Sequence, residues 1–305
     1  LQLGLTNITT AGNKNESAVV ALASNGSGTS GLASLSLGTA TIGITGTAFN
    51  VAQGAATPTP INLGNFRVGS AGGAAPQSQN VAVANTVAGP FTESLGIGSA
   101  SINNAAFALT NNLGSGLIAA GTSNASALNV ARTGGVAGLN TGTLAIQYTS
   151  DGAGTSGLAA INANSQNVSV SASGFVTASA NALPTTVNLG NFRAGSGAQS
   201  QVVSVANTAV GPVGFVEGLA AVIGTTSNGA TGTGFANAAA GGSGNLVVGL
   251  GAIAAGANSG TVSVQLQSNG TTTTGSNGLG SLDLGSAQTV TVTGTGWRLA
   301  QAGVV

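Results

Sequence analysis

The chain has 305 residues but only five basic and five acidic side chains, so its formal net charge at neutral pH is zero. It contains no His, Cys or Met, which removes the usual ligands of zinc, copper, haem and iron–sulfur clusters, the commonest general base, the thiol nucleophile and every disulfide. A neutral chain also lacks the basic surface that attracts nucleic acid, so we expect no nucleic-acid partner.

Residues 1–56 contain two runs in which apolar and polar residues alternate. The first run precedes an Asn-Gly pair at 25–26, and the second run carries Ile42 and Ile44 before Phe49. Alternation with a period of two is typical of half-buried β-strands, and Asn-Gly is typical of the turn or loop between two strands. This closing block of strand, loop and strand returns twice, around Asp-Gly at 151–152 and Asn-Gly at 269–270, before Phe175 and Trp297.

An opening block occurs only twice, near residues 57 and 183. Its run Asn-Leu-Gly-Asn-Phe-Arg at 62–67 returns at 188–193, and its Gln-Ser-Gln at 77–79, followed by an alternating run, returns at 199–201. Each opening block is followed by a closing block, so we predict two complete repeats, 57–182 and 183–305. Residues 1–56 hold only a closing block and are predicted to be the second half of a repeat, incomplete alone.

The repeats are predicted to be β-sandwiches. Gly and Asn interrupt every window that is long enough for three helical turns, so helical signals are almost missing. A β-solenoid is the alternative, because it shares the Gly, Asn and Ala enrichment, but it should show a coil period of about 20 to 30 residues, which this sequence lacks. Period-two runs inside long repeats favour an all-β chain of tandem immunoglobulin-like β-sandwiches.

The motifs of the repeat resemble a known family. Both repeats open with Pro-x-x-(Ile/Val)-Asn-Leu-Gly-Asn-Phe-Arg and continue with Gln-Ser-Gln-x-Val-x-Val-Ala-Asn-Thr, and the last one closes with Val-Thr-Val-Thr-Gly-Thr-Gly. This pattern is similar to the choice-of-anchor D modules of bacterial surface proteins, which are immunoglobulin-like and related in pattern to hydin-type modules. The resemblance implies a secreted or surface-anchored, non-enzymatic array. The chain departs from the family in its shortage of charge and in showing no anchor segment.

The charged residues also follow the repeat. Arg67 and Arg193 occupy one repeat position, and Glu93 and Glu217 occupy another, shortly after Gly-Pro. We therefore expect each repeat to pair its own Arg with its own Glu, in a structural role.

Chemistry of other kinds has little support in the sequence. The acids are spread at one or two per module, which argues against the paired carboxylates of glycoside hydrolases and against a calcium cluster. Ser and Thr are abundant, but no His or Ser-x-x-Lys arrangement supplies a base. We therefore predict no catalytic, cofactor-binding or metal site and no enzyme activity. The acids considered are Glu16, Glu93, Asp151, Glu217 and Asp283.

Aromatic residues recur at fixed repeat positions, Phe49, Phe175 and Trp297 at one and Phe66 and Phe192 at another. In modules with so few large side chains, we predict that all five are largely buried, and that Phe192→Ala costs about 3 to 5 kcal/mol of stability. Trp297 replaces Phe in the last repeat and is a candidate contact to a neighbouring molecule.

No apolar stretch reaches the roughly 20 residues that a spanning helix needs, so no membrane span is expected. Together with the resemblance, these features predict an extracellular structural protein, a self-assembling subunit of a bacterial surface filament, layer or matrix. The alternative is a stalk segment of a large cell-surface adhesin.

The half-repeat at 1–56 bears on how such a subunit would assemble. Half a sandwich leaves strand edges and an apolar face in water, which β-proteins avoid. The missing strands belong either to a preceding stretch of a longer polypeptide or to another copy of the chain. In the second case, strand complementation through residues 1–56 would join copies head to tail into an open homopolymer.

Overall fold

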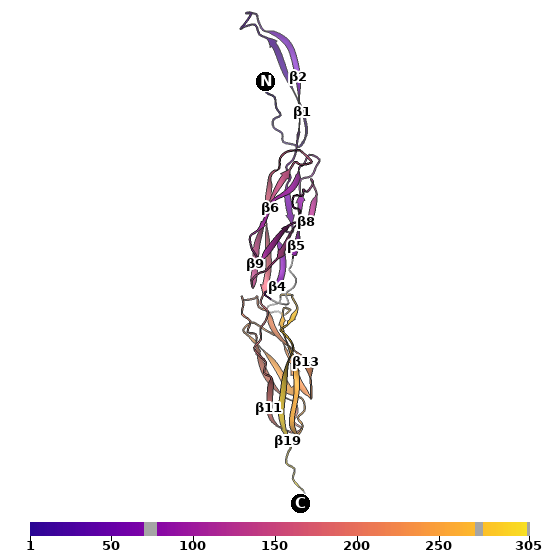
Figure 1. The fold of residues 1–305 in the computed structure, drawn as a ribbon, viewed down its shortest axis with the longest axis vertical. Coiled ribbons are helices and arrows are strands. Elements are labelled where there is room, and N and C mark those ends of the chain that lie inside the picture. The colour runs from indigo at the N-terminus through magenta and orange to yellow at the C-terminus, as the bar shows by residue number, and fades with distance from the viewer. Residues whose placement is uncertain (70–77, 272–276, 304–305) are drawn as a thin grey trace.

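The computed structural model describes residues 1–69, 78–271 and 277–303. A β-hairpin and two β-sandwiches follow one another along the axis of a long, narrow rod (Figure 1). The predicted all-β class and its tandem sandwiches are confirmed. Among the described residues, no helix has the length and apolar character needed to cross a membrane.

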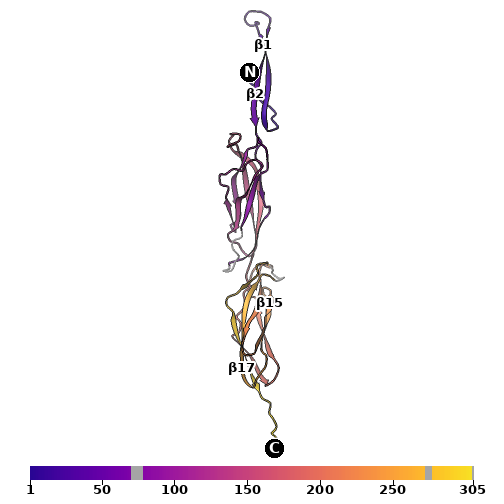
Figure 2. The ribbon, with the colours of Figure 1, turned by 90° about the vertical axis from the view of Figure 1, so that its right-hand side faces the viewer.

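The hairpin consists of β1 (Gly12–Ser24) and β2 (Leu35–Ala48), which pair antiparallel with Ala18 opposite Ile42. The Asn-Gly pair at 25–26 begins the loop between them, where the N–H groups of residues 29–31 donate to the carbonyl of Gly26. No other strand of the described chain pairs with either β1 or β2. The hairpin therefore projects beyond the first sandwich as a thin two-stranded ribbon in both side views (Figures 1 and 2).

The first sandwich packs a sheet of order β4-β10-β9-β6 against one of order β3-β5-β8-β7. In the first sheet β4 runs parallel to β10, while β9 pairs antiparallel with both β10 and β6. The strands of the first sandwich are β3 (Gly54–Thr57), β4 (Ile61–Arg67), β5 (Ser78–Asn85), β6 (Ser94–Ile102), β7 (Phe107–Asn111), β8 (Ser123–Arg132), β9 (Gly138–Asp151) and β10 (Ile161–Phe175).

The second sandwich keeps the same central strand order, with sheets β11-β19-β17-β13-β15 and β12-β16-β14. It differs in that β15 extends the first sheet, β18 pairs with β17, and no strand of the described chain takes the place that β3 has beside β5. Here β11 runs parallel to β19, as β4 does to β10. Its strands are β11 (Thr186–Arg193), β12 (Gln199–Ala206), β13 (Gly218–Thr226), β14 (Ala230–Thr233), β15 (Phe235–Ala238), β16 (Ser243–Leu250), β17 (Gly256–Asn269), β18 (Ser281–Asp283) and β19 (Gln288–Trp297).

Each sandwich has its own core of apolar side chains from alternating strand positions. One core runs from Ala52 to Ala172 and contains the fully buried Tyr148, and the other runs from Ala178 to Val292. Both cores begin a few residues before positions 57 and 183, where the motifs place the starts of the repeats. The short strand β3 accordingly pairs with β5 inside the first sandwich.

The recurring aromatic residues differ in burial. Phe66 and Phe175 are buried as predicted, whereas Phe49 and Phe192 are half-buried. The prediction is wrong for Trp297, whose side chain is 62% exposed. The cause is position, because Trp297 ends the last strand of the second sandwich, where no further described module covers it.

Candidate functional site at the junction between modules

The two sandwiches meet through a buried ion pair that joins different repeats. The Nε of Arg67, the last residue of β4, donates to both carboxylate oxygens of Glu217 at 2.8 Å, and the two side chains are 5% and 0% exposed. Arg67 Nη2 donates to the carbonyl of Gly280. The guanidinium thus contacts the carboxylate through Nε alone and uses Nη2 on the backbone, and charge-assisted bonds of this kind are stronger than neutral ones.

The backbone on each side fixes these two groups. β4 lies parallel to β10, with Arg67 opposite Phe175 at the end of both strands. On the second sandwich, the N–H of Glu217 donates to the carbonyl of Val176, which follows β10 directly. The Phe175 ring packs on Phe215 with centroids 5.4 Å apart. The junction is therefore a consequence of the strand ends, which bring Arg67 and Glu217 to one place.

Hydroxyl and amide groups complete the environment of the Glu217 carboxylate. Ser268 Oγ donates to Oε2 and Asn277 Nδ2 donates to Oε1, while Asn65 of the first sandwich donates to the Asn277 carbonyl at 2.7 Å. Ser268 Oγ itself accepts from the N–H of Ala178 at 2.7 Å. Both carboxylate oxygens are thus satisfied without water, as a buried charge requires.

The predicted pairing within each repeat is wrong. Arg67 pairs with Glu217 of the following repeat and not with Glu93 of its own. The reason is the direction of the strands, because β4 ends at one end of its sandwich whereas Glu93, immediately before β6, lies at the end where the chain enters (Figure 1). A spacing read along the sequence cannot tell the two ends of a sandwich apart.

Glu93 lies in a second copy of this acidic site, at the hairpin end of the first sandwich. Its side chain is 4% exposed and accepts hydrogen bonds from Ser150 Oγ at 2.6 Å and from Ser156 Oγ. Gly152 allows the loop to close here, because a Cβ on it would collide with Ser156 Oγ. No cation pairs with Glu93 in the described part of the chain. We call Glu93, Ser150 and Ser156 the Glu93 niche.

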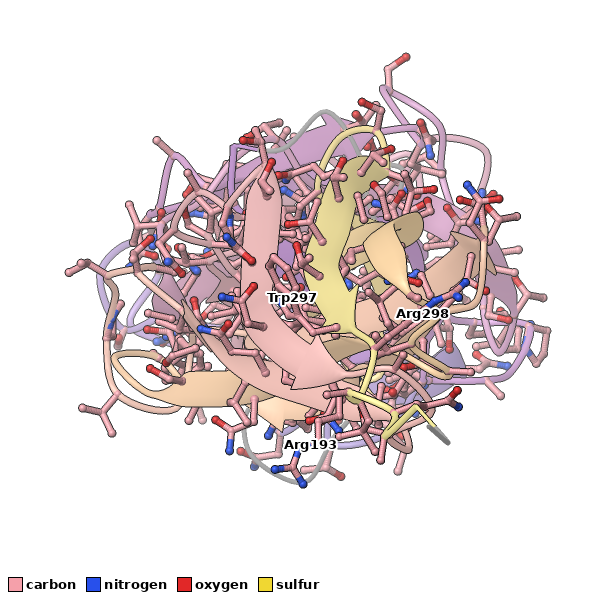
Figure 3. All side chains as sticks on the ribbon, turned by 90° about the horizontal axis from the view of Figure 1, so that it is seen from below. Arg193, Trp297 and Arg298 are labelled. Carbon is pink, nitrogen blue, oxygen red and sulfur yellow. The ribbon has the colours of Figure 1, made fainter. Side chains whose placement is uncertain are left out.

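The other half of the junction is repeated at the opposite end of the rod. Arg193 ends β11 beside Trp297, which ends β19, in the register that Arg67 and Phe175 have in the first sandwich. Trp297 Nε1 donates to Asn191 Oδ1 at 3.2 Å. Figure 3, viewed along the rod from this end, shows Arg193 at the rim, and Arg193, Trp297 and Arg298 are all exposed. We call Asn191, Arg193 and Trp297 the distal end face.

The hairpin carries residues that are equivalent to core residues of the sandwiches, but no second sheet of the described chain packs on it. Ala18 opposite Ile42 in the hairpin matches Leu144 opposite Val168 and Val262 opposite Val290 in the two sandwiches. Val168 and Val290 are fully buried, whereas Ile42 is 40% exposed. At Phe49 the hairpin meets the first sandwich, and this ring packs edge-on against Phe91 with centroids 5.9 Å apart.

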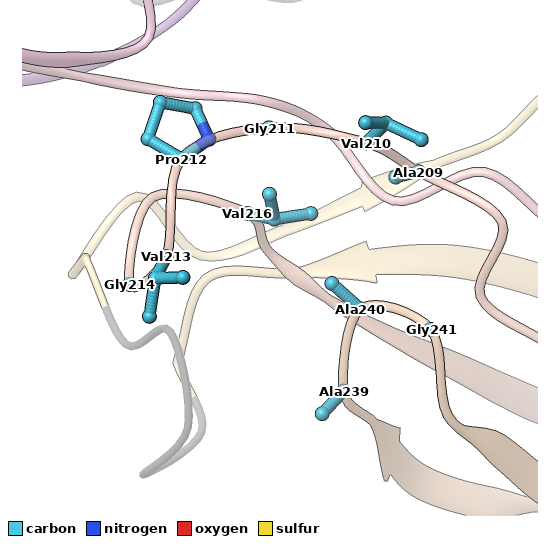
Figure 4. Close-up of a pocket in the computed structure, with 10 residues that line it drawn as sticks. All are labelled: Ala209, Val210, Gly211, Pro212, Val213, Gly214, Val216, Ala239, Ala240 and Gly241. Atoms are coloured by element: carbon cyan, nitrogen blue, oxygen red, sulfur yellow. The ribbon is translucent and has the colours of Figure 1, made fainter.

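One pocket of the second sandwich is lined by apolar residues alone. It measures about 460 Å³ and lies between the loops 209–214 and 239–241 of the second sandwich, which present only Ala, Val, Gly and Pro (Figure 4). A binding pocket needs some polar groups to orient its ligand, and this one lacks polar side chains. Across the described residues, no three acidic side chains gather in a group that could hold a metal ion.

A recurring serine is the sequence signal that could have located this site. A serine precedes each Asn-Gly or Asp-Gly pair of the closing block, at Ser24, Ser150 and Ser268. In both sandwiches this serine donates to the buried glutamate. Its recurrence beside the loop, together with the recurring Glu, marks the acidic half of the junction.

The chain is similar to known proteins only in its fold. No family model and no curated protein matches the chain. Among solved structures it is similar to mouse protocadherin PcdhgC3 EC1-3, with 11% sequence identity, 92% of this chain and 77% of that chain covered, and a TM-score of 0.38. The protocadherin GammaB4 extracellular domain matches with 10% sequence identity and a TM-score of 0.36. The match covers 92% of this chain and 38% of that chain, so the chain spans less than half of its length. Surface layer protein SbsC, domains 1-6, matches with 12% sequence identity and a TM-score of 0.21, and the match covers 86% of this chain and 42% of that chain.

Proposed function

We propose that the chain is a non-enzymatic, extracellular structural protein that assembles with copies of itself into a bacterial surface filament, layer or matrix. The observation that carries the proposal is the β1–β2 hairpin, which exposes large apolar side chains such as Val19, Leu22 and Ile42 and whose two outer edges pair with no strand in the described chain. Open edges of this kind pair readily with strands of another molecule.

Two further features support this function. The two sandwiches carry unlike halves of one junction at their outer ends, the Glu93 niche where the hairpin joins the first sandwich and the distal end face at the ends of β11 and β19 (Figures 1 and 3). Contacts between unlike surfaces are heterologous and extend into open polymers instead of closing dimers. The shortage of charge also leaves little repulsion between copies.

Deletion of residues 1–48 tests the proposal. It removes β1 and β2 but leaves Phe49, the bridge from Asn50 to Thr92, and the first core, which begins at Ala52. We expect the full chain to form regular polymers in negative-stain electron microscopy and sedimentation, and the deletion variant to stay monomeric with an unchanged β-sheet circular dichroism spectrum. Polymers of unchanged form from the deletion variant would contradict the proposal.

The alternative function, a stalk segment of a large adhesin, predicts a different image. A stalk remains a single thread of modules at every concentration, because its contacts all run along one chain. A full-length protein that stays monomeric across the concentration series, with the hairpin intact, would favour this alternative.

A further inference from the structure

The Glu93 niche is a copy of the Glu217 site that lacks the cation. Both carboxylates sit at the entry of a sandwich, both accept from the serine that precedes an Asp-Gly or Asn-Gly pair, and both are almost completely buried. Glu217 receives Arg67 on its remaining side, whereas Glu93 receives only hydroxyl groups. A buried carboxylate without a cation is costly, so this site favours an arginine.

None of the five Lys and Arg side chains of this sequence is placed to supply that arginine within one copy. Lys14 donates to Thr10 beside the hairpin, Arg67 is held by Glu217, and Arg132 stacks on the Phe66 ring at 3.9 Å. The remaining cations, Arg193 and Arg298, are exposed at the distal end of the second sandwich, with the length of both sandwiches between them and Glu93 (Figures 1 and 3).

The place at the hairpin that corresponds to the arginine-bearing strand holds no strand in the described chain, although the side chain of Leu5 lies against Gly46 there. In each sandwich a strand with the run Asn-Leu-Gly-Asn-Phe-Arg lies parallel to the last strand of the closing block, β4 on β10 and β11 on β19. The matching stretch of the hairpin, residues 44–49 at the end of β2, has no strand on this edge in the described chain. Where β4 lies on β10, its arginine reaches the next glutamate.

We propose that the open edge of β2 and the Glu93 niche together form a receptor for an Asn-Leu-Gly-Asn-Phe-Arg strand, and that β11 of a second copy supplies it, so that Arg193 pairs with Glu93. The inference rests on the proposed self-assembly and names its contact. β11 is the outer strand of its sheet, so it is accessible without splitting that sheet. Opposite charges at the outer ends of the two sandwiches, Glu93 on the first and Arg193 on the second, orient the copies head to tail.

Two kinds of interaction contribute to binding at this receptor, one to affinity and the other to specificity. Backbone hydrogen bonds between added strands supply sequence-independent affinity. An arginine against a carboxylate already held by two hydroxyls supplies specificity for a strand that ends in Arg, since lysine lacks the planar set of donors with which Arg67 contacts both Glu217 and the Gly280 carbonyl.

The first experiment uses a dye-labelled peptide of residues 184–195, Pro-Thr-Thr-Val-Asn-Leu-Gly-Asn-Phe-Arg-Ala-Gly, added to the full chain and followed by fluorescence anisotropy. We expect saturable binding that weakens at least about tenfold when the peptide arginine is replaced by Gln, because a buried charge loses its partner. The same loss is expected for the chain variant Glu93→Gln, with no further loss when both changes are combined. Absence of binding, or equal binding of both peptides, overturns the proposal.

The matched control is Asp151→Asn. Asp151 lies beside the niche, opposite Ser94 on β6, and the equivalent positions in the other closing blocks are already Asn25 and Asn269. This variant removes one negative charge from the same end of the sandwich without touching Glu93. Peptide binding should change less than twofold, and a loss as large as that of Glu93→Gln would show that net charge and not the niche is recognised.

The second experiment identifies the donor in the full chain. Sedimentation equilibrium should show self-association weakened at least about tenfold by Arg193→Gln and much less by Arg298→Gln, its neighbour on the distal end. Self-association that is unaffected by both Arg193→Gln and Glu93→Gln would overturn this contact and leave the proposed function standing. A peptide that binds as expected to a chain that never self-associates would overturn the second copy as donor, and the proposed function with it.

Discussion

At the scale of single residues, one Asn-Phe-Arg triplet has two different environments in the same chain. Arg67 and Phe66 are buried because the second sandwich and Arg132 cover them, whereas Arg193 is exposed and Phe192 is half-buried. Identical side chains therefore contribute differently to the stability of the fold, because burial increases both the stabilisation from an apolar side chain and the cost of an unpaired charge.

Arg67→Gln should lower the free energy of unfolding by about 3 to 5 kcal/mol, because it leaves the Glu217 carboxylate buried without its cation. The measurement is urea denaturation followed by circular dichroism. Arg193→Gln, the same change at the exposed copy of the position, is the control and should stay within about 0.5 kcal/mol at concentrations at which the chain is monomeric. Equal effects of the two variants would contradict the structural difference between them.

Tyr148, the chain's single tyrosine, offers a titration test. Burial raises the pKa of its phenol to about 12, while the unfolded chain should titrate near the ordinary value of about 10. Because the folded state holds this proton more tightly, the stability contributed by the neutral phenol is complete below about pH 10 and is lost as the pH rises toward 12. Absorbance of the phenolate in native and urea-unfolded protein measures both values, and a native midpoint near 10 would contradict the burial.

At the scale of elements, the closing block forms the same antiparallel pair three times and is covered in only two of them. The pairing in the hairpin is local, since the two strands are joined by a short loop and their registers match those of β9–β10 and β17–β19. Burial is not local, because it needs the facing sheet, which the hairpin lacks in the described chain. A two-stranded hairpin alone is marginally stable in water.

Leu22→Ala and Leu266→Ala form a matched pair that measures this difference. The two residues occupy the same position of the block, but Leu22 is 46% exposed and Leu266 is 4% exposed. Leu266→Ala should lower the free energy of unfolding by about 2 to 5 kcal/mol, since it leaves a cavity in the second core. Leu22→Ala should change it by less than about 0.5 kcal/mol in the monomer, and a large loss there would mean that the hairpin is covered in solution.

At the scale of the whole molecule, the junction between the sandwiches could be repeated between one copy of the rod and the next. One complete junction lies between the sandwiches. Its acidic half is repeated at the outer end of the first sandwich, as the Glu93 niche, and its basic half at the outer end of the second, as the distal end face. The chain is thereby polar along its length, and end-to-end association would bring unlike surfaces together.

Trp297, the single tryptophan, reports on this association. Its side chain is 62% exposed on the distal end face, so the dilute monomer should show the red-shifted emission and ready acrylamide quenching of an indole in water. Assembly should shift the emission to the blue and reduce quenching in parallel with the sedimentation signal. An emission that is already blue-shifted in the monomer would contradict the exposed position.

Much of the architecture follows from the sequence because it depends on local and repeated patterns. Period-two alternation, loops at Asn-Gly pairs, and the recurrence of Asn-Leu-Gly-Asn-Phe-Arg predict the all-β class and the tandem sandwiches. The lack of His and Cys in the composition by itself excludes the chemistries that depend on those side chains. Each of these conclusions concerns neighbours in the chain, or copies of one segment, and needs no knowledge of which distant groups meet.

The partners of the charged side chains were decided by the tertiary structure alone. The repeat pattern marked Arg67, Arg193, Glu93 and Glu217 as equivalent pairs, but it could not show that parallel pairing of β4 with β10 carries Arg67 to the next module and not to Glu93. The exposure of Trp297 has the same origin, since equivalent positions are buried only where another module follows. Strand direction and end-to-end packing are properties of the folded rod, and they set which repeated residues face each other.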